Sequence, residues 1–451
     1  MRACGFTLAA FAALSAALAL AQNPPADANW PQFRGPAASG IGGGAVPPDS
    51  WNAESGANIR WKAALPGLGL SSPVVWGDRI FLTTAVGDAE QSLRVGLYGD
   101  VQPVNEAVPY SFRVLCLDRK TGAILWDQEA HRGVPKIKRH TKASHANSTP
   151  ATDGRHVVAF FGSEGLYCYD VDGKLLWKKD LGVLDSGWYT FRSAQWGFGS
   201  SPVIVDERVV IQCDVQEGSY LAALDIKDGR EIWRTSRNEV PTWSTPTVHR
   251  SSSRAQIICN GWRHIGGYDL ETGKELWLFE GGGDIPVPTP VVAHGLAFIT
   301  NAHGAMAPIY AIKLDAEGEI VIPEEGASGR YVQWFRARAG NYMQTPLIVG
   351  DLAYFCRDNG ILTAYRATSG EELWKQRLGG GNTGFTGSGV AGGDRLYFTS
   401  EEGDTYVLRA GEKYELIAKN SIGEYTLSTA ALSDGLLLLR GHKHLFAIGA
   451  K

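Results

Sequence analysis

Cysteine is sparse in this 451-residue chain, which holds six, and no two of them form a Cys-Cys or Cys-x-x-Cys pair. Cys4 lies at the extreme N-terminus. The other five are spread singly through strand-like apolar runs, at Cys116, Cys168, Cys213, Cys259 and Cys356. This spacing excludes a disulfide framework or a cysteine metal site of the usual kinds. It indicates small residues buried in a core.

A basic excess is also missing, because 43 Lys and Arg face 47 Asp and Glu, for a net charge of −4. Nucleic acid is therefore not expected as a partner. Beyond the N-terminus, no stretch keeps a helical period over a normal helix length, and no run is apolar enough to span a bilayer. A Gly-x-Ser-x-Gly elbow and a Walker-type phosphate loop are absent as well.

The N-terminus reads as an export signal. A short positive start is followed by an apolar run from Phe6 to Leu20 and by Ala19-Leu20-Ala21, a small-x-small cleavage pattern. The sequence predicts a signal peptide at 1–21 and Gln22 as the first mature residue. No cysteine stands at the cleavage point, so a lipid anchor is not indicated. A periplasmic or secreted location is expected.

Glycine and tryptophan are abundant, with 55 and 14 residues, and they recur in one phrase. In its clearest copy, from Tyr268 to Trp277, a strand ends in Asp, a Thr-Gly turn follows, and a second strand closes on Trp. Further copies close on Trp126, Trp177, Trp233 and Trp374. Gly supplies the positive φ that such turns need, and Trp offers a large ring for packing between units.

A second recurring signal opens each unit with small residues and Pro before an apolar strand. These openers lie at Ser71–Val75, Ser148–Ala151, Ser200–Ile204, Ser244–Val248, Pro288–Val292 and Gln344–Ile348, with weaker copies at Thr386–Val390 and Leu427–Ala431. Their spacing is often 44 residues, and each unit has room for four short strands. The pattern predicts an all-β fold, an eight-bladed β-propeller with four-stranded antiparallel blades. Seven blades is the alternative.

The last unit, from Tyr425 to the end, holds only three strands. The strand expected at 59–65 has no neighbours of its own, so we expect it to complete that blade and close the ring. The domains are then an irregular N-terminal extension at 22–57, held by Trp30, Phe33 and Trp51, and a propeller at 58–451. Two long insertions, 86–110 and 315–330, interrupt the period.

The segment from His131 to Asn147 is rich in Lys, Arg and His and connects the first unit to the second. We expect it to cross one end of the propeller near the channel. One hypothesis is an anion-binding mouth that uses Lys142, His145 and Asn147. The alternative is a solvated basic loop.

Aromatic residues occupy equivalent connections before later openers, at Trp196, Phe198, Trp243 and Tyr342. They could form a flat face for a planar ligand or a peptide, or simply pack at the channel mouth. His303 and Arg357, on turns between strands, are further candidates for ligand binding. His442 and His444 give only a weak metal signal, so no metal site is predicted.

The Asp-x-x-Thr-Gly-x-x-x-Trp phrase with its Ser-x-Pro openers resembles the tryptophan-docked repeat of pyrroloquinoline-quinone (PQQ) type propellers, over residues 59–451. The lead Trp-Pro-Gln-Phe-Arg-Gly-Pro at 30–36 resembles exported bacterial members. The resemblance implies one of two functions, that of an enzyme or that of a scaffold. Quinoprotein dehydrogenases carry a Cys-Cys pair and a Ca²⁺ ligand set, while the propeller lipoprotein of the outer-membrane β-barrel assembly machinery is a scaffold.

The leading expectation is an exported, non-catalytic binding or scaffold protein that presents a ligand or protein-binding surface at the channel mouth. Its partners would be envelope proteins or a small anionic ligand, and a monomer is expected. The alternative is a PQQ-dependent oxidoreductase acting on alcohols or sugars, with PQQ and Ca²⁺ as cofactors. The missing Cys-Cys pair favours the first reading. No catalytic residue is assigned.

Overall fold

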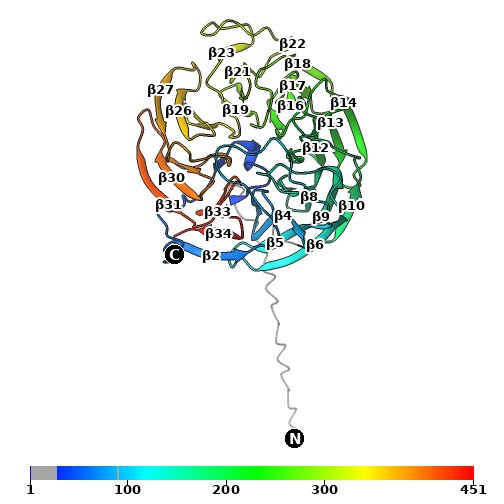
Figure 1. The fold of residues 1–451 in the computed structure, drawn as a ribbon. Coiled ribbons are helices and arrows are strands. Elements are labelled where there is room, and N and C mark those ends of the chain that lie inside the picture. The colour runs from blue at the N-terminus through cyan, green and yellow to red at the C-terminus, as the bar shows by residue number, and fades with distance from the viewer. Residues whose placement is uncertain (2–27, 89–90, 451) are drawn as a thin grey trace.

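The computed structural model describes Met1, residues 28–88 and residues 91–450, and it shows eight β-sheets arranged in a ring (Figure 1). Six sheets have four strands and two have five. The eight-bladed, all-β prediction is confirmed, and the seven-bladed alternative is wrong. The expected signal peptide at 1–21 lies, apart from Met1, outside the described residues. Within the described part, no helix is long and apolar enough to cross a membrane.

The blades follow one another in chain order, and in each the strands run from the channel outward. Blade 1 contains β3 (Val74–Trp76), β4 (Arg79–Gly87), β5 (Tyr110–Asp118) and β6 (Ile124–Gly133), and blade 2 contains β7 (Ala151–Thr152), β8 (His156–Phe160), β9 (Leu166–Asp170) and β10 (Leu175–Lys179). Blade 3 contains β11 (Val203–Val205), β12 (Arg208–Cys213), β13 (Tyr220–Asp225) and β14 (Glu231–Ser236), and blade 4 contains β15 (Thr247–Arg250), β16 (Ala255–Cys259), β17 (Ile265–Asp269) and β18 (Glu275–Phe279).

Blades 5 to 8 repeat this order. Blade 5 contains β19 (Val291–Ala293), β20 (Leu296–Thr300), β21 (Ile309–Lys313) and β23 (Val332–Arg336), and blade 6 contains β24 (Leu347–Val349), β25 (Leu352–Cys356), β26 (Ile361–Arg366) and β27 (Glu372–Arg377). Blade 7 contains β28 (Val390–Gly392), β29 (Arg395–Thr399), β30 (Asp404–Arg409) and β31 (Leu416–Ser421), and blade 8 contains β32 (Ala431–Ser433), β33 (Leu436–Arg440) and β34 (His444–Ile448). The described residues also form two short 3₁₀ turns, η2 (Pro36–Ala38) and η3 (Gly162–Glu164).

The ring closes through β2 (Ile59–Ala64), which forms the outer strand of blade 8. It runs antiparallel to β34, with Lys62 opposite Phe446. The expected closure by the N-terminal strand is therefore confirmed. Joining the two ends of the chain in one sheet removes the free edges that the first and last blades would otherwise expose.

Tryptophan joins six of the eight blades to the next one. Six indole N–H groups donate to a backbone carbonyl of the following blade at 2.6–3.2 Å, those of Trp61, Trp126, Trp177, Trp233, Trp334 and Trp374. Five of the rings lie against the turn glycine of that blade, at Gly122, Gly173, Gly229, Gly273 and Gly370. Those glycines have positive φ, and a Cβ there would lie 2.4–2.9 Å from the ring. The Thr-Gly-x-x-x-Trp phrase thus encodes contacts between neighbouring units.

Among the closing tryptophans of the repeated phrase, Trp277 makes no such bond, and β31 of blade 7 contains no tryptophan. The Trp277 indole N–H donates to Gln256 Oε1 in its own blade, at 3.0 Å. The insertion at 315–330 replaces the short turn of the following blade, and within it β22 (Gly318–Glu319) pairs with β18 instead. Blade 4 therefore gains a fifth strand.

The Ser/Thr-Pro openers form a second set of contacts, around the channel. In six places the N–H of an opener residue donates to a hydroxyl of the next opener at 2.9–3.0 Å, through Ser72→Thr149→Ser201→Thr245 and Thr289→Thr345→Ser388→Thr429. A buried inner strand has no neighbour on its channel side, so these hydroxyls satisfy N–H groups that would otherwise be orphaned. We call this set the hydroxyl ring.

The extension enters the channel and is not wholly irregular. β1 (Ile41–Gly42) pairs in parallel with β28, and the blue segment lies at the centre of the ring (Figure 1). Trp30 and Trp51 are buried in the hydrophobic core, as expected, whereas Phe33 is half-buried and faces a cavity. The fully buried Arg34 donates to four carbonyl oxygens, two of them from blades 6 and 7. Burial lowers its pKa to about 9.

The hydrophobic core lies in the seams between blades. One cluster joins Val158 and Phe160 of blade 2 to Val209 and Ile211 of blade 3. The five cysteines beyond the N-terminus are buried and free, as the sequence predicted.

Candidate functional site

A cavity of about 530 Å³ lies at the end of the channel where the openers begin, which we call the channel mouth. Each of the eight blades contributes residues to its wall from the opener or just before it. Phe33 of the extension also lines it. The connections between blades therefore converge on one site, as the sequence analysis expected.

The insertion of blade 1 lies over this cavity. We call its described part, residues 91–109, the mouth loop. Five of its residues, Leu97 to Val101, line the cavity. The loop is held from two sides, because the Gly96 N–H donates to Glu401 Oε2 at 2.8 Å and the Trp196 indole donates to the Val101 carbonyl at 2.8 Å.

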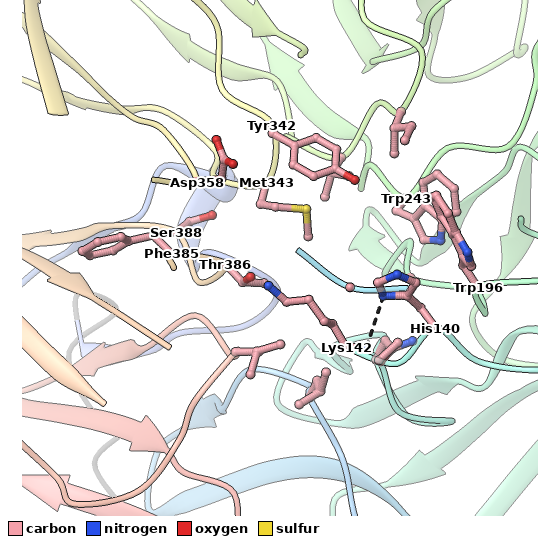
Figure 2. Close-up of a pocket in the computed structure, with 18 of the residues that line it drawn as sticks. His140, Lys142, Trp196, Trp243, Tyr342, Met343, Asp358, Phe385, Thr386 and Ser388 are labelled. Carbon is pink, nitrogen blue, oxygen red and sulfur yellow. Dashed lines mark hydrogen bonds between the residues drawn. The ribbon is translucent and has the colours of Figure 1, made fainter. Parts of the chain in front are cut away.

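One side of the cavity is aromatic. The ring centroids of Trp188 and Trp196 lie 6.1 Å apart in a stacked pair, and those of Trp196 and Trp243 lie 5.7 Å apart. His303 continues the row, 5.5 Å from Trp188 and 5.7 Å from Tyr342. Figure 2 shows Trp196 and Trp243 on one side of the cavity and Asp358 on the other.

Four of the five Lys and Arg side chains of the basic segment are paired with carboxylates, and the exception is Lys138, which donates to Asn105 Oδ1 at 3.1 Å. The ammonium of Lys142 lies 2.7 Å from Glu401 Oε1, and that of Lys136 lies 3.3 Å from Asp180. Arg139 has a fully buried side chain paired with Glu106. A simultaneous Ala substitution of Lys136, Lys138, Arg139 and Lys142 is not expected to leave folding intact, because truncating Arg139 would remove the buried arginine partner of Glu106.

Three groups near the mouth have shifted pKa values. Burial opposes ionisation of Glu106, but the neighbouring His145 and Arg139 outweigh it and hold the pKa of Glu106 at about 2. Burial lowers the pKa of His140 to about 4, so this cavity residue is neutral at pH 7. Burial raises the pKa of Asp358, although Lys142 and Arg357 act in the opposite direction.

Six of the nine candidate residues from the sequence line the cavity: Lys142, Asn147, Trp196, Trp243, His303 and Tyr342. His145 and Phe198 are buried and line a small separate recess. Arg357 lines neither, and its guanidinium donates to the Arg338 carbonyl at 2.6 Å. As a set, the nine residues are not brought together.

Sequence reasoning did not assign Trp188, Asp358 or the mouth loop to the site. Asp358 lies in the turn between the second and third strands of its blade, and His303 and Glu401 lie in the same turn of theirs. The turn between the second and third strands lies at the same end of every blade as the opener. This shared position could have indicated from the sequence that Asp358, like His303, lies at the channel mouth.

The cavity was tested against PQQ with Ca²⁺. Within residues 28–88 and 91–450, no group of three or more His, Cys, Asp or Glu could hold a metal ion. PQQ carries three carboxylates, whereas the cavity lining has one ammonium, Lys142, and it is already paired with Glu401. The residues present do not fit this cofactor.

Comparison with known sequences gives consistent matches. A family model described as outer membrane protein assembly factor BamB matches residues 111–376. The chain is 24% identical over 231 residues to BamB of Shewanella oneidensis, and 24% identical over 274 residues to that of Salmonella typhimurium. These matches cover 49% and 59% of this chain. They span 54% and 64% of the relatives, so the chain spans less than two thirds of their length.

Solved structures show the same fold at low identity. BamB of Moraxella catarrhalis is 14% identical with a TM-score of 0.52, covering 81% of this chain and 99% of that one. A quinohemoprotein alcohol dehydrogenase of Comamonas testosteroni is 13% identical with a TM-score of 0.59, covering 95% and 82%. The resemblance to PQQ-type propellers is thus confirmed. Because the family model spans more than half of its residues, the chain belongs to the family described as outer membrane protein assembly factor BamB.

Proposed function

We propose that this chain is an exported, non-catalytic binding and scaffold protein of the bacterial envelope, whose working surface is the channel mouth. Support comes from the family, which is described as an assembly factor and not as an enzyme. The predicted signal at 1–21 supports export. Membership alone does not decide function, because one fold can serve many.

The observation that carries the proposal is the cavity of about 530 Å³ at the mouth, with the mouth loop over it and the extension beneath. Wide, partly apolar cavities with a few polar groups are where proteins commonly bind ligands. Tyr98, at the rim, is 71% exposed, so a large aromatic side chain faces solvent beside the cavity. Exposed aromatic residues are enriched where proteins bind one another.

The second candidate is a PQQ-dependent oxidoreductase acting on alcohols or sugars. One observation favours it, the stacked faces of Trp188 and Trp196, which would suit a planar ligand. The charge of the lining and the lack of a metal-ligand group among the described residues favour the scaffold instead.

Site-specific photo-crosslinking in the native host tests the scaffold proposal. A benzophenone side chain replaces Tyr98 at the mouth or, as a control, the exposed Lys413 in the β30–β31 turn at the opposite end. We expect discrete adducts with envelope proteins from position 98 and none from position 413. Equal adducts from both positions, or none from either, would contradict the proposal.

A further inference from the structure

We propose that the mouth cavity binds a small organic cation of the quaternary ammonium or alkylammonium class, with the ring faces of Trp188, Trp196 and Trp243 as its wall and Asp358 as its counter-charge. The inference rests on the proposed function in one respect, that the mouth is the binding surface. It adds the chemistry of the ligand.

Two of the three tryptophans, Trp196 and Trp243, offer ring faces but no free hydrogen-bond donor. The Trp196 indole N–H is used by the Val101 carbonyl at 2.8 Å, and that of Trp243 by the Gly197 carbonyl at 2.7 Å. Both side chains are only half-buried, and both line the cavity. The face of an indole ring is the negative side of its quadrupole and attracts cations. With their donors occupied, these rings favour a cation or an apolar group over an anion.

The charge of the lining decides between a cation and a neutral ligand. Its charged residues are Asp100, Lys142, Asp358 and Glu401. Asp100 pairs with Arg94 at 2.6 Å, and Lys142 pairs with Glu401 at 2.7 Å. Asp358 forms no salt bridge with any described residue. Two histidines in the lining do not alter this balance, because His140 is neutral at pH 7 and His303 lies 2.6 Å from Asp284.

Asp358 is held in place by backbone contacts, and Lys142 and Arg357 act on it only at a distance. Its carboxylate is met by backbone N–H groups of its own turn, and it lies opposite the tryptophans (Figure 2). A half-buried carboxylate that no cation contacts directly is costly, and an approaching cation would lower that cost. Burial raises the pKa of Asp358, in agreement with this account.

The shared chemistry is the ammonium head, which a free solute or a lipid headgroup could supply. Calorimetric titration of the purified mature protein with choline tests the inference, and 3,3-dimethylbutan-1-ol serves as the uncharged molecule of the same shape. We expect choline to bind at least about tenfold more tightly, which corresponds to about 1.4 kcal/mol. Sedimentation with phosphatidylcholine vesicles distinguishes the two sources of the ammonium group. If the protein sediments with the vesicles, the ligand is a lipid headgroup, and if it stays in the supernatant, the ligand is a free solute.

Two variants locate the effect. Asp358→Asn should weaken choline binding about tenfold, while Asp351→Asn, in an exposed turn at the opposite end of the same blade, should leave it unchanged. Equal binding of choline and its uncharged analogue, no choline binding, or an unchanged Asp358→Asn variant would each overturn the inference. The scaffold proposal is tested independently of this inference, because the crosslinks expected at position 98 do not depend on choline.

Discussion

The ammonium of Lys142 lies 2.7 Å from Oε1 of Glu401, and this ion pair joins the connection between blades 1 and 2 to a turn of blade 7. Both side chains are buried, with exposures of 12% and 1%. Glu401 also accepts the Gly96 N–H at 2.8 Å. One carboxylate of blade 7 therefore ties down both the basic segment and the mouth loop.

Removing one partner of this pair should be costly. Lys142→Met should lower the free energy of unfolding by about 3–5 kcal/mol, because it leaves the buried Glu401 charge unpaired. Chemical denaturation measures the loss, and hydrogen exchange should show faster exchange at Gly96. Lys142→Met combined with Glu401→Gln should recover part of the loss. Simple additivity of the two changes would contradict the pairing.

The contact between Trp233 and the turn glycine of blade 4 can be tested against a matched glycine. Gly273 and Gly218 have φ values of 71° and 80°. A Cβ at Gly273 would lie 2.4 Å from the Trp233 ring, whereas at Gly218 nothing lies within 4 Å. Both Ala variants carry the backbone strain of about 1–2 kcal/mol. Gly273→Ala should destabilise the fold well beyond Gly218→Ala in urea denaturation, and equal losses would refute the docking account.

The hydroxyl ring supplies its own control. Thr345 Oγ1 accepts the Thr289 N–H at 3.0 Å, so Thr345→Val should cost about 1–3 kcal/mol by orphaning that donor. The Thr289 hydroxyl is buried, and no described residue bonds to it. Thr289→Val should therefore be close to neutral. Melting curves that rank the two variants in the opposite order would disprove the role of the ring.

Acid should weaken the contact between the mouth loop and the basic segment through Glu106. Its pKa is about 2 in the folded protein against an ordinary value of 4.5. A lowered pKa contributes stability that is present above about pH 4.5 and lost as the pH falls toward 2. In Glu106→Gln, unfolding free energy should fall less steeply between pH 4.5 and 2 than in wild type. The exposed Glu54→Gln variant should retain the wild-type slope, and a Glu106→Gln slope as steep as wild type would count against this role.

Most of the fold could be predicted because its signals are local and repeated. The Thr-Gly turn and the Ser/Thr-Pro opener each mark a strand boundary, so the eight units and the closing strand followed from their spacing. Trp277 shows where this fails. Its phrase is the most regular in the sequence, yet its partner turn in blade 5 is replaced by an insertion, and the indole bonds within its own blade.

The site was only partly predictable, because charge pairing depends on contacts between distant residues. The sequence showed the cations of 131–147 but not their partners. Glu401 lies 259 residues from Lys142. The aromatic candidates Trp196 and Trp243 were found because their place before an opener fixed them at the mouth. Asp358 and Trp188 lie in the same cavity, but they were not assigned to it, although the turn of Asp358 and the connection of Trp188 both lie at this end of their blades.

The most direct test of the central claim, a non-catalytic mouth, is a titration of the mature protein with PQQ, with and without Ca²⁺. The same samples are then assayed for dye reduction with simple alcohols and sugars. The account predicts no Ca²⁺-dependent binding and no turnover, because the lining offers one paired ammonium and the described residues offer no metal-ligand group. Tight Ca²⁺-dependent binding followed by dye reduction would contradict it and identify a quinoprotein oxidoreductase.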